Sequence, residues 1–105
     1  MKNIGILGSG KIAIDLLLKI SKQEDCNCVV MSGRRLGTDG SRVANDLNIP
    51  FTDQGISGLL EYKDKLDIVI DATNAVDHVN HWKILKENNL SVIDMTPSDV
   101  GNLSL

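Results

Sequence analysis

The segment formed by residues 3–20 constrains the fold of this 105-residue chain more than any other part of it. A short apolar run at residues 4–7 ends at Gly8-Ser9-Gly10-Lys11-Ile12-Ala13, and apolar residues then recur at helical spacing as far as Ile20. A buried strand, a tight glycine turn and an amphipathic helix follow one another in this order in dinucleotide-binding folds. We therefore expect the turn to lie at a phosphate-binding site, with an ordinary strand–helix turn as the alternative.

Each small residue of the turn has a physical role in this prediction. Gly8 lacks a Cβ and lets the chain turn sharply at the end of the strand. Gly10 allows a pyrophosphate to approach the backbone, and Ala13 allows the helix to lie close to the sheet. The unpaired N–H groups at the start of the helix, with their partial positive charge, form an anion site.

The rest of the chain predicts strands that alternate with helices. We expect strands at residues 28–31, 51–52, 67–72 (with a four-residue core at 68–71) and 91–94. We expect helices at residues 41–47 and 77–89, and a short helix or turn at residues 55–62. Alternation of this kind indicates a parallel sheet with right-handed crossovers. The fold class is α/β: one Rossmann-type, doubly wound domain over residues 1–105, with a sheet of about five strands in the order 3-2-1-4-5.

Three details of these elements can be checked against a structure. Pro50 at the start of the third strand suits an edge position, where a missing N–H costs no ladder hydrogen bond. Asp39 or Ser41 is expected to cap the helix at residues 41–47. The helix at residues 77–89 is expected to bury Val79, Trp82 and Leu85 on its apolar face and to end at Asn88-Asn89 in a left-handed cap.

Composition excludes several classes of function. The net charge of −3, the pI near 5.2 and the lack of a basic stripe argue against nucleic acid as a partner. No apolar run approaches the roughly 20 residues that span a bilayer. Met1-Lys2-Asn3 leads directly into the first strand without room for a signal peptide, so we expect a cytoplasmic protein. Cys26 and Cys28 form C-x-C rather than C-x-x-C and are expected to be structural, with a reactive thiol as the minority interpretation.

The end of the second strand selects the cofactor in such folds. A carboxylate about 20 residues past the glycines favours NAD, but here the chain reads Met31-Ser32-Gly33-Arg34-Arg35. Arginine offers forked donors that match a 2′-phosphate, and Ser32 offers a hydroxyl. The sequence therefore favours NADP slightly, with use of NAD or of both cofactors left open. The alternative is that Arg34 and Arg35 are solvated loop residues.

Several segments together resemble the N-terminal NAD(P)-binding domain of acylating acetaldehyde dehydrogenases. The likeness covers nearly the whole chain and keeps its spacing, which makes it more specific than the glycine turn alone. The segments that carry it are Ile6-Leu7-Gly8-Ser9-Gly10-Lys11-Ile12 with Asp15-Leu16, Thr38-Asp39-Gly40, Gly55-Ile56-Ser57-Gly58-Leu59-Leu60, Asp71-Ala72-Thr73 with His78-Val79, and Val92-Ile93-Asp94-Met95-Thr96-Pro97 with Gly101.

The resemblance implies roles for particular residues. It places Ser9, Gly10, Lys11 and Ile12 at the cofactor pyrophosphate and the segment Ala72-Thr73-Asn74 beside the ribose and nicotinamide. Lys11 stands where the family often has Asn, and Asn74 where it tends to have Ser. Family members that use NAD tend to carry an acid near the position of Arg34 or Arg35, so the cofactor of this chain stays open between NAD and NADP.

The resemblance also implies an activity that this chain cannot complete. An acylating dehydrogenase uses a thiolate to attack the aldehyde, passes hydride to nicotinamide and yields the acyl group to CoA. The family's catalytic thiol lies in a domain that follows the Rossmann segment, and this domain is absent from the chain. Family members often pair with a 4-hydroxy-2-oxovalerate aldolase, and exposure of the face that a second domain covers would favour a homo-oligomer.

The remaining candidates have structural explanations that we prefer. His78 and His81 lie one turn apart but lack a third metal ligand, so no metal site is predicted. Asp71 and Asp94, at strand ends, are expected to make turn and loop hydrogen bonds rather than to act as a carboxylate pair. Ser98 and Asp99 have no suitable histidine for a catalytic triad. Other functions that stay open are a stand-alone NAD(P)H-binding module and the first half of a semialdehyde dehydrogenase.

Overall fold

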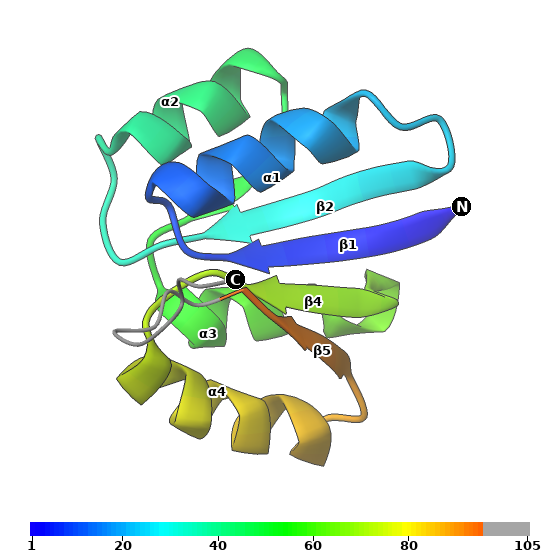
Figure 1. Ribbon diagram of the computed structural model, residues 1–105, viewed down its shortest axis with the longest axis vertical. Helices are drawn as coiled ribbons and strands as arrows, with labels where there is room; N and C mark the ends of the chain where they lie inside the picture. The colour runs from blue at the N-terminus through cyan, green and yellow to red at the C-terminus, as the bar shows by residue number, and fades with distance from the viewer. Residues whose placement is uncertain (96–105) are drawn as a thin grey trace, which may run out of the picture.

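The computed structural model describes residues 1–95 as a single layer of β-sheet with helices on both faces (Figure 1). The strands are β1 (Lys2–Leu7), β2 (Cys26–Ser32), β3 (Phe51–Thr52), β4 (Ile68–Asp71) and β5 (Ser91–Asp94). The helices are α1 (Lys11–Ser21), α2 (Asp39–Asp46), α3 (Gly55–Leu60), a 3-10 turn at Lys63–Lys65 and α4 (Ala75–Glu87).

All four pairs of neighbouring strands are parallel, and the strand order is β3-β2-β1-β4-β5. The predicted doubly wound fold and the predicted order are therefore confirmed, as is the edge position of β3 after Pro50. The order reverses direction at β1, so the connections after β1 and β4 leave a crevice between them. Ligands of such sheets bind at this point, outside the carboxyl ends of the strands.

The two faces of the sheet carry separate hydrophobic cores. Ile4 and Ile6 of β1 point toward α1 and α2 and pack with Ala13 and Leu17. Leu7 points to the opposite face and packs in the second core with Leu59, Val69 and Leu85. Successive side chains of β1 thus contribute to the cores on both faces of the sheet, as expected for a central strand of a parallel sheet. Ala13 is fully buried, which agrees with its predicted role in bringing α1 close to the sheet.

The predicted cap of α2 and the predicted burial of one residue of α1 are wrong. The α2 helix begins at Asp39, and Thr38 rather than Asp39 or Ser41 caps it, because the Thr38 hydroxyl accepts a hydrogen bond from the Ser41 N–H. Ile12, which helical spacing groups with the apolar residues of α1, is 36% exposed, whereas Ala13 beside it is buried.

The predicted apolar face of α4 is also wrong. Leu85 is buried, but Val79 is 67% exposed and Trp82 is 50% exposed. His81 and His78 lie one and two helical turns before Leu85 and occupy the inner side of the helix, so that Val79 and Trp82 turn outward. The left-handed cap is confirmed, because Asn89 has a φ of 61°.

Two sequence predictions fall outside the part of the chain that the structure describes. They are the part of the family resemblance carried by Thr96, Pro97 and Gly101, and the assessment of Ser98 and Asp99. No helix within residues 1–95 is long and apolar enough to cross a membrane.

A candidate dinucleotide-binding cleft

A cleft of about 900 Å³ opens at the carboxyl ends of the central strands. A volume of this order is typical of sites for small molecules and cofactors. Its walls come from the β1–α1 turn, the β2–α2 loop, the start of α3 and the β4–α4 turn. Ten of the predicted site residues line it: Gly8, Ser9, Gly10, Lys11, Ser32, Arg34, Arg35, Ala72, Thr73 and Asn74. Ile12 does not line it, although its N–H belongs to the first turn of α1.

The β1–α1 turn has the tight geometry that its glycines predict. Gly8 has a φ of 119°, and a Cβ added there would lie 2.9 Å from the Ala72 carbonyl oxygen. The Gly8 N–H also donates to the Ser32 carbonyl over 2.7 Å. The turn is thus held between the ends of β2 and β4, and only glycine fits this backbone.

The start of α1 is open toward a ligand. Gly10 is the N-cap and no side chain caps the helix. The Ile14 N–H bonds to the Gly10 carbonyl, so the N–H groups of the three preceding helical residues have no acceptor within the helix. A Cβ on Gly10 would meet nothing within 4 Å, which leaves free space beside these donors. Free space, three donors and the positive end of the helix suit the pyrophosphate of a dinucleotide.

Two glycines outside the motif allow Ser9 to pack into this corner. A Cβ at Gly33 would lie 2.7 Å from the Ser9 hydroxyl, and one at Gly40 would lie 2.5 Å from the Ser9 carbonyl oxygen. Gly33 follows β2 and Gly40 lies in the first turn of α2. The end of β2 and the start of α2 therefore both pack against Ser9, an arrangement that the sequence analysis did not identify.

The arginines beside the cleft differ in their partners. Arg34 forms an ion pair with Asp77, and Arg42 forms one with Asp39. Arg35 is exposed and makes no ion pair within residues 1–95. The Ser32 hydroxyl donates to the Gly55 carbonyl and is 1% exposed, so its proton is already used inside the protein.

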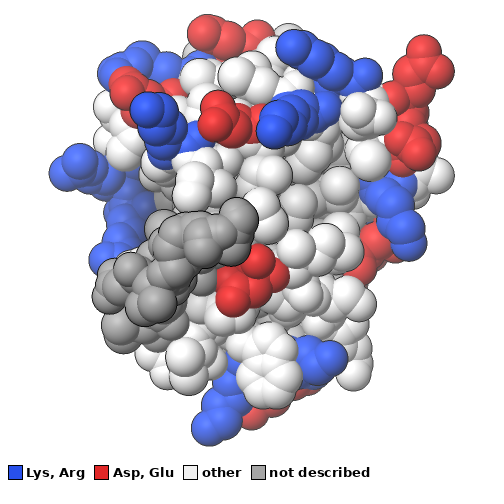
Figure 2. Space-filling view, in the orientation of Figure 1, with Lys and Arg blue, Asp and Glu red and all other residues white. Residues whose placement is uncertain are grey.

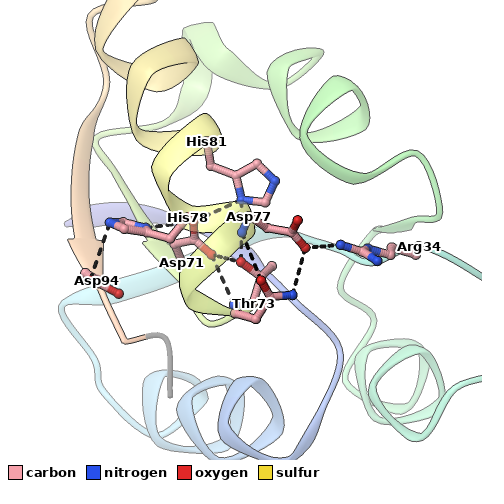
Figure 3. A network of polar contacts seen from close by, with 8 residues as sticks. Arg34, Asp71, Thr73, Asp77, His78, His81 and Asp94 are labelled. Carbon is pink, nitrogen blue, oxygen red and sulfur yellow. Dashed lines mark hydrogen bonds and ion pairs between the residues drawn. The ribbon is translucent and has the colours of Figure 1, made fainter. Parts of the chain in front are cut away.

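A buried carboxylate organises the β4–α4 side of the cleft (Figure 3). Asp71 is fully buried and accepts hydrogen bonds from the Nδ1 atoms of His78 and His81, at 2.9 and 3.0 Å, and from the N–H and hydroxyl of Thr73. Burial acts to raise the pKa of Asp71, but the hydrogen bonds from His81, Thr73 and His78 outweigh it and hold this pKa well below its usual range. Asp71 is therefore ionised at neutral pH and fixes both imidazole rings.

Asp94 joins the same network from the end of β5. Its Oδ2 lies 3.5 Å from the Nε2 of His78, so His78 stands between two strand-end carboxylates. Among residues 1–95, no group of three or more His, Cys, Asp or Glu side chains is arranged to hold a metal ion. The expectation that Asp71 makes turn hydrogen bonds is confirmed by its bonds to Thr73.

The cysteines lie away from the cleft lining. Cys28 is buried in the core of the α1 side, and burial raises its pKa to about 11 despite a hydrogen bond to the Val30 carbonyl. This confirms the structural interpretation of Cys28, because a thiol that stays protonated is a poor nucleophile. Cys26 is half-buried at the start of β2, and both cysteines are free.

Five residues with polar or charged side chains also line the cleft and were not among the predicted site residues. They are Thr38, Asp39, Arg42, Asp77 and His81. Asp77 carried a readable signal, because Asn74 precedes it by three residues and the two side chains form a cap at the start of α4. His81 carried none, since its position follows from the side of α4 that faces β4.

No protein-family model matches the chain. The acetaldehyde dehydrogenase of Pectobacterium atrosepticum is 39% identical to it over 102 residues, which are 97% of this chain and 34% of that protein. The corresponding protein of Spirochaeta aurantia is 40% identical over 102 residues, with the same coverage. That of Geobacillus stearothermophilus is 40% identical over 100 residues, or 95% of this chain and 34% of that protein.

This chain is homologous to the N-terminal part of acetaldehyde dehydrogenases. It spans about a third of the length of these curated relatives. A solved structure, apo saccharopine dehydrogenase (L-Glu forming) from Saccharomyces cerevisiae, superimposes with a TM-score of 0.71 at 24% identity, over 95% of this chain and 22% of that one. At this identity the likeness supports the fold. The dehydrogenase homologues and the Rossmann-type fold together imply a nicotinamide dinucleotide as the ligand.

Proposed function

We propose that this chain is the NAD(P)-binding domain of an acylating aldehyde dehydrogenase, which converts an aldehyde, CoA and NAD(P)⁺ to acyl-CoA and NAD(P)H. The observation that carries the proposal is the open start of α1 at Gly10, facing free space inside the cleft. Homology to the N-terminal part of acetaldehyde dehydrogenases supports the same conclusion.

In this proposal the residues of the chain bind and orient the cofactor. The N–H groups of the first turn of α1 and the turn residues Ser9 and Gly10 hold the pyrophosphate, with Lys11 adding a positive charge. Ala72, Thr73 and Asn74 follow the path of the ribose and nicotinamide at the end of β4. The dinucleotide supplies the hydride acceptor when it is bound.

The preference for NADP over NAD is part of the proposal. Arg34 and Arg35 occupy the place where a carboxylate favours NAD, and Arg35 has no carboxylate partner within residues 1–95. An arginine without an ion pair is available for bidentate contact with a phosphate. Ser32 supports this preference less, since its hydroxyl already donates to Gly55.

Other parts of the proposal concern the rest of the enzyme. The raised pKa of Cys28 does not suit a catalytic nucleophile, so the thiol that attacks the aldehyde is assigned to a separate catalytic domain, with residues 1–105 forming the cofactor domain. The proposal also includes a 4-hydroxy-2-oxovalerate aldolase as the source of the aldehyde. It further includes a homo-oligomeric state and a cytoplasmic location.

Titration with NADH and NADPH, followed through the fluorescence of the reduced nicotinamide, tests the proposal. Trp82 does not line the cleft, so the ligand gives the better signal. Gly10→Ala is the informative variant. A Cβ there meets no protein atom and the φ of −89° suits alanine, so the fold is kept. The methyl group would occupy space that the pyrophosphate needs, and we expect affinity to fall by about tenfold or more.

Ser57→Ala, at an exposed position of α3 outside the cleft, is the matched control and should bind as the unsubstituted chain does. Circular dichroism of all three proteins checks that the fold is unchanged. Lack of binding of both dinucleotides at millimolar concentration, or equal binding by Gly10→Ala, would contradict the proposal.

A further inference from the structure

An ion pair links the two sides of the cleft. Arg34 comes from the loop after β2, and Asp77 comes from the first turn of α4. The Arg34 Nη2 atom contacts the Asp77 Oδ2 atom, and both residues line the cleft (Figure 3). The two residues are 43 positions apart in sequence. The pair therefore extends across the cleft rather than along one of its walls.

The two partners differ in how firmly they are held. Asp77 forms a reciprocal cap with Asn74: its N–H donates to the Asn74 Oδ1 over 2.9 Å, and its Oδ2 accepts from the Asn74 Nδ2 over 2.8 Å. The Asp77 side chain is 24% exposed, whereas that of Arg34 is 76% exposed. Arg34 is thus the partner that can move, and Asp77 is a fixed carboxylate that draws it across the cleft.

The partners of the neighbouring arginines link this ion pair to the choice between NAD and NADP. Arg42 is held by Asp39, and its Nη1 donates to the Gly37 carbonyl. Arg35 has no ion pair within residues 1–95. A 2′-phosphate that reaches this loop therefore meets Arg35 directly, but it gains Arg34 only when Arg34 leaves Asp77. NAD carries no 2′-phosphate and leaves the pair intact.

We propose that Asp77 is a specificity-determining residue, which lowers the preference for NADP over NAD by holding Arg34 across the cleft as a competing anion. This inference rests on the proposed function, because it assumes that the cleft binds these dinucleotides. Arginine binds phosphate in the same bidentate geometry as carboxylate, so binding of NADP exchanges the carboxylate of Asp77 for the phosphate. The exchange costs the energy of the existing pair.

The test compares Asp77→Asn with the unsubstituted chain. Asn keeps an oxygen for the cap with Asn74 and removes the charge that attracts Arg34. Because Arg34 is largely exposed, its pair has the modest strength of a surface ion pair. We expect the ratio of the NADPH to the NADH affinity to rise about twofold to fivefold, measured by titration calorimetry. Asp64→Asn, a matched loss of charge at the opposite end of β4, should leave the ratio unchanged.

A double-mutant cycle decides whether Asp77 acts through Arg34. In a chain that already carries Arg34→Gln, Asp77→Asn should no longer change the ratio of affinities. If the ratio rises equally in both backgrounds, Asp77 does not act through Arg34 and the proposed competition is wrong. If Asp77→Asn strengthens both dinucleotides alike, Asp77 does not determine specificity. The proposed function survives either result. Absence of binding of NADPH and NADH to every variant would overturn both together.

Discussion

Among single residues, Asp71 is the one on which the geometry of the β4–α4 side depends most. It is a fully buried, ionised group, and a buried charge is tolerated only when hydrogen-bond donors surround it. His78, His81 and Thr73 supply these donors. Because His81 lines the cleft, the carboxylate also fixes the orientation of a ring that faces the ligand space.

We predict that Asp71→Asn destabilises the fold by about 2 kcal/mol or more at pH 7, because hydrogen bonds to a charged group contribute about 1.5–3 kcal/mol. The pKa of Asp71 is lower in the folded state than its ordinary value of 3.8, so the folded state binds fewer protons below that pH. The stabilisation is complete above pH 3.8 and is lost as the pH falls toward the lower folded pKa.

Urea unfolding of both proteins at pH 7, 5, 4 and 3 measures this effect. The deficit of Asp71→Asn should be constant from pH 7 to pH 5 and shrink below about pH 4. Asp46→Asn, at an exposed position near the end of α2, serves as the control for the loss of one negative charge. A deficit that stays the same down to pH 3 would contradict a depressed pKa.

Among secondary-structure elements, α2 is placed by its contact with the glycine turn. Gly40 lies in its first turn, and a Cβ there would come within 2.5 Å of the Ser9 carbonyl oxygen and 2.8 Å of the Ser9 Cα. These are backbone atoms of the turn, which cannot rotate away as a flexible side chain would. The absence of a side chain at Gly40 thus sets how closely α2 approaches the phosphate-binding corner.

We predict that Gly40→Ala destabilises the chain by about 1–3 kcal/mol, the usual cost of overpacking. The gain of about 0.5–1 kcal/mol in helix propensity offsets part of this cost. The variant should also weaken dinucleotide binding, because Ser9 must move. Chemical denaturation and the amide NMR shift of Ser9 give the two measurements.

Asn45→Ala, at an exposed position of the same helix, is the matched control and should change the unfolding free energy by no more than about 0.5 kcal/mol. A stable Gly40→Ala variant with an unshifted Ser9 amide would show that the clash is relieved elsewhere.

At the scale of the whole molecule, residues 1–95 cover the two faces of β5 unequally. Val92 packs against the core that contains Leu85, on the side of α4. Ile93 and Met95 alternate to the other face and are 43% and 42% exposed. Figure 1 shows α1 and α2 over the half of the sheet that lies away from β5. Figure 2 shows a band of uncharged residues across this view, with a patch of acidic residues beside it at the centre. Exposed apolar side chains at a sheet edge favour association.

We predict that the 105-residue chain self-associates through this face at high concentration. Ile93→Thr keeps a β-branched residue in the strand and removes apolar surface, so it should shift the concentration dependence toward monomer. Light scattering coupled to gel filtration, over a range of protein concentrations, gives the measurement.

Trp82→Gln, on the outer side of α4 where Trp82 is 50% exposed, is the matched control for loss of an exposed apolar side chain. It should leave the association unchanged if β5 carries the contact. A chain that stays monomeric at every concentration, or whose association responds to Trp82→Gln alone, would contradict the prediction.

The sequence by itself determined the strands, their order and the position of the phosphate-binding turn. Periodicity and glycine chemistry act over a few neighbouring residues, so Gly8, Gly10 and the alternation of strands and helices are readable without coordinates. Even the edge position of β3 followed from Pro50, through the hydrogen bond that proline cannot donate.

Tertiary structure alone decided what meets across the cleft. Gly33 and Gly40 pack against Ser9, Arg34 pairs with Asp77, and Asp71 fixes His81, because the strand order brings three loops to one corner. The same histidines explain why the predicted apolar face of α4 is wrong. They occupy its inner face with hydrogen bonds to a buried carboxylate, so hydrophobic periodicity assigned Val79 and Trp82 to the core. Local sequence patterns show which side chains are apolar, whereas only the folded chain determines which polar side chains have hydrogen-bond partners in the interior.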